Sequence, residues 1–226
     1  MKRIIFRKSL AIFLTLLTIF CTAFMLACRE KESYETYLTE LKTDVFKGDN
    51  ETLSLKAQYG FNKAENSATE SRVYGLYFYL LGVDGDNITR TISMAENGKT
   101  YADTFALNPV TDKTTAFIEI ENFTKKTFTV TISEGSNRYE ITLSSILPEK
   151  TITYKDALTH LQTEHGNFLD AYKTADGKFN AKLIMRVIVK DNKSYWYVGL
   201  IDDSDSLKAF LLDGISGKTL AVREVF

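Results

Sequence analysis

The sequence has few of the residues that crosslink or interrupt a fold. Its 226 residues include two cysteines, two prolines and two histidines. The cysteines are Cys21 and Cys28, so no disulfide and no thiol nucleophile is available beyond residue 28. Such a chain depends on its core, and a 44% share of apolar residues makes that feasible. Two prolines and twelve glycines also exclude a low-complexity composition.

An excess of positive charge is also missing. The chain has 28 basic and 29 acidic side chains. Without residues 1–27, which hold four of the basic ones, 28 − 4 = 24 basic and 29 acidic side chains remain, a formal net charge of −5. Proteins that bind nucleic acid carry a basic patch or stripe. Nucleic acid is therefore not an expected partner.

Motifs that supply catalysis or a cofactor are absent from the sequence. It contains no G-x-S-x-G elbow of a serine hydrolase. His160 and His165 lie five positions apart, or about 140° around an expected helix and its end, which is not the i, i+4 spacing of a zinc pair. Two acidic clusters lack the glycine and glutamate positions of an EF-hand loop. They are Asp84 with Asp86, and Asp202 with Asp203 and Asp205.

Distant acids could still form a glycosidase pair, but the sequence cannot select one. We therefore expect no catalytic residue, no metal and no cofactor.

The N-terminus has the layout of an export signal. Four basic residues precede an uncharged apolar run, residues 9–27. The run ends in Met25-Leu26-Ala27-Cys28, which resembles the lipobox of bacterial lipoproteins, with Met25 where leucine is commoner. The resemblance implies a signal peptide at 1–27 and a diacyl anchor, such as palmitate, on Cys28. The alternative is an uncleaved transmembrane anchor, because about 18 apolar residues can span a bilayer. Either arrangement places the protein on the outer face of the cell membrane.

Residues 28–50 are expected to form a tether with a short helix. Apolar residues recur there at helical spacing. Such a helix either packs on the following domain or binds a partner. The residues of this stripe are Tyr34, Tyr37, Leu38, Leu41 and Val45.

Residues 51–147 are expected to fold as an antiparallel, immunoglobulin-like β-sandwich. Apolar and polar residues alternate in short runs, as in 128–132 and 139–143, which is typical of strands with one buried face. Turn signals at 84–87, 96–98 and 134–137 separate about seven strands. The paired cysteines of antibody domains are missing. The prediction therefore concerns an architecture and not a family.

Residues 151–226 are expected to form a second, smaller α+β domain. Pro148, within 147–150, ends a strand and marks the boundary. Residues 153–156 resemble a capping box, with Asp156 in place of the usual glutamate, and Gly166 can close the helix. Four strand-like runs come after it, which predicts a helix packed on an antiparallel meander.

Three segments of this region resemble the PepSY domain family. They are Thr153–Leu158, Tyr195–Val198 and Leu212–Lys218. In the last segment, Asp213 and Gly217 are expected to form a hairpin turn, because aspartate accepts nearby backbone bonds and glycine adopts positive φ. The resemblance implies a role in binding or restraining other proteins, with peptidases as proposed targets, outside the cytoplasm. It brings no catalytic residues.

Two surfaces are candidates for binding. Tyr77 and Tyr79 share a face of the aromatic run 73–81, where they form a platform for a glycan or peptide or lie beneath a loop or domain. Ile184, Arg186 and Ile188 form a mixed face opposite the apolar face of their strand. An exposed strand edge could also accept an extended peptide.

We therefore expect a surface-tethered, non-enzymatic binding lipoprotein with a protein or peptide partner. The alternatives are an extracytoplasmic hydrolase and an accessory subunit of an envelope or transport complex. A pocket with converging ionisable groups would favour an enzyme, whereas a flat or edge-strand surface would favour a binding module.

Overall fold

A computed structural model describes residues 34–63, 71–82, 88–108, 113–176, 178–204 and 206–225. The expected signal peptide, Cys28 and the Asp84–Asp86 cluster lie outside these residues, as does Asp205. Residues 35–226 form one compact unit. No helix in the described ranges is long and apolar enough to cross a membrane.

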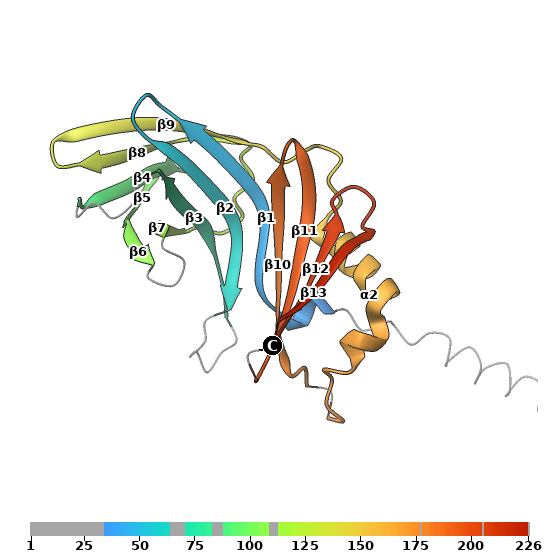
Figure 1. The fold of residues 1–226 in the computed structure, drawn as a ribbon. Helices are drawn as coiled ribbons and strands as arrows, with labels where there is room; N and C mark the ends of the chain where they lie inside the picture. Colours follow the sequence, from blue (N-terminus) through green and yellow to red (C-terminus); the bar gives the residue numbers. More distant parts are fainter. Residues whose placement is uncertain are drawn as a thin grey trace, which may run out of the picture. The chain divides into compact units, whose positions relative to one another are not determined.

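The described chain is mainly β, with thirteen strands in one sheet and a single α-helix (Figure 1). The 3₁₀ turn η1 (Tyr34–Tyr37) comes first. The strands before the helix are β1 (Leu38–Asp49), β2 (Ser54–Lys63), β3 (Arg72–Leu81), β4 (Arg90–Glu96), β5 (Lys99–Thr104), β6 (Ala106–Asn108), β7 (Lys113–Glu119), β8 (Thr127–Glu134) and β9 (Asn137–Ser145). Helix α2 (Tyr154–Asp170) is succeeded by strands β10 (Ala181–Lys190), β11 (Lys193–Asp202), β12 (Leu207–Asp213) and β13 (Thr219–Val225).

Strand β1 joins two groups of strands. Its first half pairs in parallel with β10, with Leu38 opposite Leu183, and its far end pairs with β9. Its other edge pairs with β2. From β1 the sheet runs through β2, β3 and β7 to β6, and through β10, β11 and β12 to β13. A branch through β9, β8 and β4 ends at β5.

The expected helix within residues 28–50 is wrong, because residues 38–49 form strand β1. The register of β1 against β10 shifts between Leu38 and Glu40. Such a bulge adds a residue, so that Leu38 and Leu41 share one face although they are three positions apart. The spacing of Leu38 and Leu41 therefore fits a helix as well as this strand, whereas Val45, opposite Gln58, lies on the other face.

Residues 147–151 connect two parts of the same sheet. The strands before and after this connection belong to one compact unit, because β10 pairs with β1. The structure therefore shows one continuous sheet on both sides of Pro148, and not the two separate folding units that the sequence predicted. The reason is that β1, which is distant in sequence, completes the C-terminal group of strands.

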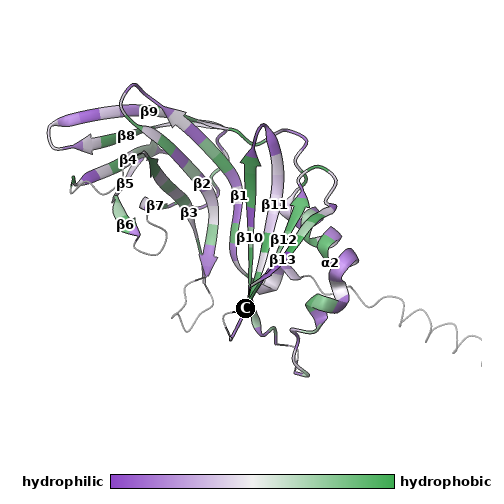
Figure 2. Ribbon diagram, in the orientation of Figure 1, coloured by the Kyte–Doolittle hydropathy of each residue, from purple (hydrophilic) through white to green (hydrophobic). Residues whose placement is uncertain are grey.

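The larger core lies between the β1–β2–β3–β7 layer and the β4–β8–β9 layer. Aromatic rings meet edge to face at its centre, where the Phe128 ring lies 5.1 Å from Phe46 and 4.9 Å from Phe123. The alternation expected for residues 128–132 is confirmed, because Phe128, Val130 and Ile132 are buried in this core. Figure 2 shows the corresponding bands of polar and apolar residues along the strands.

Helix α2 covers a second core on β10, β11 and β12. The capping box at its start is confirmed, because Thr153 and Asp156 exchange hydrogen bonds. Buried Trp196 donates from Nε1 to the carbonyl of Ile152, 3.1 Å away. The helix does not end at Gly166 but continues to Asp170, with non-helical backbone angles at His165.

Both cores lie on the same side of the central sheet. Leu41 and its partner Met185 face the helix. Leu41 is also opposite Phe61, which lies on the same face of β2 as the residues of the larger core. The opposite side of the sheet is therefore covered neither by α2 nor by the β4–β8–β9 layer. We call this side the open face.

Candidate functional site: the open face of the sheet

The open face extends over β7, β3, β2, β1, β10 and β11. Residues that are directly opposite each other on neighbouring strands point to the same side of a sheet. Pairs such as Tyr77 with Phe117, and Arg186 with both Lys42 and Tyr197, therefore define the face. Its main side chains are Glu40, Lys42, Lys47, Lys56, Tyr77, Tyr79, Lys113, Phe117, Ile184, Arg186, Ile188 and Tyr197.

The two binding surfaces predicted from the sequence are parts of this one face. Tyr77 and Tyr79 lie on β3, whereas Ile184, Arg186 and Ile188 lie on β10. Strands β2 and β1 bring them together, and Arg186 is close enough to influence the pKa of Tyr79. This convergence could not be predicted, because it depends on the pairing of β1 with β10.

Tyr77 and Tyr79 are half-buried by their neighbours within the face. The Tyr77 ring lies 4.6 Å from the ring of Phe117. Burial raises the pKa of both tyrosines, so their hydroxyls stay protonated at neutral pH. They therefore combine an apolar ring with an uncharged hydroxyl.

Lys42 is an unexpected residue at the centre of the face. Its residue surface is 2% exposed, and its Nζ lies 3.0 Å from the centroid of the Tyr77 ring. The same atom donates to Asn62 Oδ1 at 3.0 Å. Burial lowers the pKa of Lys42 to about 7, with Glu40 acting against the shift and Arg186 adding to it. Sequence reasoning missed Lys42 because the residue falls outside the apolar stripe of the expected helix and lysine is rarely fully buried.

Arg186 is held by an ion pair with Glu40. Its Nε and one terminal nitrogen donate to the two carboxylate oxygens at 2.6 and 2.8 Å. These bonds raise the pKa of Arg186. The bidentate geometry fixes β10 against β1.

Three lysines lie around Tyr79 at the other part of the face. Lys56 on β2 is directly opposite Tyr79 on β3. On its other side, Lys56 is directly opposite Lys47 on β1. The Nζ atoms of Lys56 and Lys113 lie 6.0 and 5.9 Å from the centroid of the Tyr79 ring. Burial and, to a smaller extent, the charge of Lys113 lower the pKa of Lys56.

Asp213 and Gly217 have a structural place in the turn between β12 and β13. Asp213 Oδ1 accepts from the backbone nitrogens of Ile215 and Ser216 at 3.1 and 2.8 Å, and these bonds lower the pKa of the carboxyl. Gly217 has φ +72°, and a Cβ there would lie 2.3 Å from His160 Cδ2. The turn therefore requires glycine at this position.

Glu164 and His165 both lie beside Thr219, whose hydroxyl donates to Glu164 Oε2. His165 Nε2 lies 3.0 Å from Thr219 Oγ1, and His160 packs beside Gly217. Asp202 accepts bonds from the backbone of Ser204 and Ser206 and so closes a turn. Across the described ranges no three histidine, cysteine, aspartate or glutamate side chains are placed to hold a metal ion.

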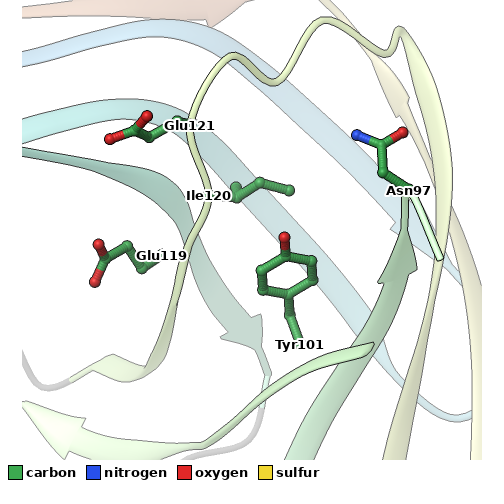
Figure 3. Close-up of a pocket in the computed structure, with 5 residues that line it drawn as sticks. All are labelled: Asn97, Tyr101, Glu119, Ile120 and Glu121. Atoms are coloured by element: carbon green, nitrogen blue, oxygen red, sulfur yellow. The ribbon is translucent and has the colours of Figure 1, made fainter. Parts of the chain in front are cut away.

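An open pocket of about 430 Å³ lies beside the β4–β5 turn and the end of β7 (Figure 3). Its lining includes two carboxylates, Glu119 and Glu121. In Figure 3 both extend to the same side, away from Tyr101. The other lining residues are Asn97 and Ile120.

Comparison of the chain with protein-family models, curated proteins and solved structures finds no match. The resemblances to bacterial lipoproteins and to the PepSY family stay predictions.

Proposed function

We propose that the protein is a non-enzymatic binding lipoprotein that holds a protein or peptide partner against its open face. The observation that carries this proposal is the convergence of two predicted binding surfaces on one side of the sheet that neither core uses. The same proposal places the chain at the outer face of the cell membrane, attached through lipid on Cys28.

The composition of the open face favours a macromolecular partner. Tyrosine and arginine are enriched at protein interfaces, where they supply large contact areas and directed hydrogen bonds. Tyr77, Tyr79 and Arg186 are such residues, and Ile188 beside them is 40% exposed. A broad sheet face of this kind suits a protein surface better than a small molecule, which is usually enclosed by a pocket.

A second point of attachment is the edge of β13. This strand pairs only with β12 among the described strands, and Leu220 and Val222 on it are 50% and 47% exposed. A free edge can accept an extended peptide as an added strand. This mode agrees with the PepSY-like role of binding or restraining a peptidase, which we include in the proposal.

The proposal is tested by crosslinking in membranes. A photoreactive amino acid replaces Ile188 in the full-length, lipidated protein. The control replaces Leu107, which is 53% exposed and pairs with Thr114 on the other side of the sheet. A specific partner should be captured from position 188 and not from position 107. Equal capture at both positions, or none at 188, would reject the open face as the binding site.

Anchoring is tested separately with Cys28→Ala. This change should abolish incorporation of a labelled fatty acid and leave an uncleaved precursor or a released protein. Two acyl chains are needed for stable attachment, so the variant should also leave the membrane fraction unless the apolar run is retained. Absence of label on the wild-type protein would exclude the lipid anchor.

A further inference from the structure

The lysines around Tyr79 form a basic cluster within the open face. Lys47, Lys56 and Lys113 come from β1, β2 and β7, and Tyr79 on β3 lies between the last two. Lys47 and Lys56 are directly opposite each other in the sheet. Like charges in this position destabilise a pair of strands.

The cluster has no acidic partner among the described residues. Asp49 lies two positions from Lys47 on β1 but forms no ion pair with the three lysines. By contrast, Arg186 is paired with Glu40, and Lys126 is paired with Asp44 at 3.1 Å. The half-buried ammonium of Lys56 therefore has an aromatic ring beside it instead of a carboxylate.

We propose that this basic cluster binds acidic side chains on a segment of the partner. The inference rests on the proposed function, and it names the chemistry that the open face recognises. Anionic groups placed above Tyr79 would offset the repulsion between the lysines and restore counter-charge to Lys56. Beyond residue 27 the whole chain, with the cluster included, has a formal net charge of −5, so the basic cluster is a local exception to the sign of the protein's charge.

The dimensions of the cluster favour a peptide with several acidic residues. From β1 to β7 the cluster crosses three inter-strand spacings, roughly 14 Å. In an extended peptide every second side chain points the same way, at intervals of about 6.6 Å, so three alternating acidic residues cover a similar length. The adjacent rings of Tyr77 and Phe117 provide apolar contact beside them.

The experiment measures binding of a fluorescent peptide with four Asp-Ala repeats to the full-length, lipidated protein in zwitterionic detergent. The control peptide has Asn-Ala repeats. Wild-type protein should bind the aspartate peptide better, and the preference should decrease as salt is added. The double variant Lys56→Gln/Lys113→Gln should weaken binding about tenfold. The matched variant Lys150→Gln/Lys218→Gln removes the same charge from exposed positions in two turns and should change affinity less than about twofold.

Several results would overturn this inference. One is equal affinity in the two double variants, and another is equal binding of the two peptides or no binding of either. Binding of a sulfated polysaccharide through Lys56 and Lys113 without binding of the aspartate peptide would replace the peptide with another polyanion. A partner that is captured at position 188 and is unaffected by Lys56→Gln/Lys113→Gln would reject the basic cluster while leaving the proposed function intact.

Discussion

Positive side chains on the two parts of the open face have different neighbours: a carboxylate on β10, and tyrosine rings on β1 and β2. On β10, Arg186 is 46% exposed at its side chain and is paired with the carboxylate of Glu40. On β1 and β2, Lys42 and Lys56 are more buried and lie against tyrosine rings. The first arrangement is complete within the protein. In the second, Lys42 is enclosed, whereas Lys56 has no carboxylate paired with it among the described residues and is where an external acidic group would gain most.

This difference has a geometric origin. Glu40 and Ile184 are opposite each other across the parallel β1–β10 pair, so the carboxylate comes beside Arg186 two positions further along. On the other edge of β1, Lys42 is opposite Gly60 of β2, and Gly60 is in turn opposite Gly75 of β3. A Cβ on Gly60 would lie 1.8 Å from the carbonyl oxygen of Leu41, and one on Gly75 would lie 2.4 Å from the Phe117 ring. The two glycines therefore allow the β1 backbone and the Phe117 ring to approach closely at this part of the face.

The largest expected effect comes from the buried lysine of this comparison. Lys42 has a folded-state pKa of about 7, below its ordinary value of 10.5, so the unfolded chain binds a proton between these pH values and the folded chain does not. Its contribution to the free energy of unfolding should rise with pH above 7 and level off below it. Each pKa unit corresponds to about 1.4 kcal/mol, which gives a total of a few kcal/mol.

Urea unfolding of wild-type protein and Lys42→Met from pH 7 to 9.5 checks this prediction. The variant should be more stable at pH 7 by about 2 kcal/mol, and because wild type gains about 3 kcal/mol by pH 9.5, the order of the two stabilities should reverse within this range. The range ends at pH 9.5 because burial raises the pKa of Tyr77 above its ordinary value of 10.0. At higher pH this tyrosine ionises in the unfolded chain first, which lowers the free energy of unfolding. A variant that is less stable than wild type at pH 7 would show that the Tyr77 contact outweighs the burial of charge.

An intermediate effect is expected from breaking the ion pair on the other part of the face. Glu40→Gln should lower the free energy of unfolding by about 1–2 kcal/mol, because the partly exposed Arg186 loses its charged partner. Arg186→Met and the double variant complete a thermodynamic cycle. A coupling energy near zero in that cycle would mean that the pair does not fix β10 against β1.

The smallest effect is expected from Lys56→Gln/Lys113→Gln. Removal of like charges should raise the free energy of unfolding by about 0.5 kcal/mol at low salt, and the gain should disappear at high salt. Thermal unfolding at two salt concentrations measures it. If this double variant is destabilised as much as Glu40→Gln, both parts of the open face hold the fold together and the contrast between them is lost.

Local pattern was sufficient for the elements whose contacts are close in sequence. The capping box at Thr153, the alternation of Phe128 to Ile132 and the helix that precedes a meander could all be predicted, because each depends on neighbouring residues. The sequence also placed Tyr79 and Arg186 opposite the apolar faces of their strands. It could not show that they share a face.

Tertiary structure alone decided the character of β1, the continuity of the sheet and the state of Lys42. A bulge put Leu38 and Leu41, three positions apart, on one face of β1, and only pairing with β2 and β10 fixed it as a strand. That pairing joined regions more than 140 residues apart, as between Leu38 and Leu183. Chain-distant strand pairing leaves no local periodic signal, so the sequence determined which residues alternate and the folded sheet determined which of them meet.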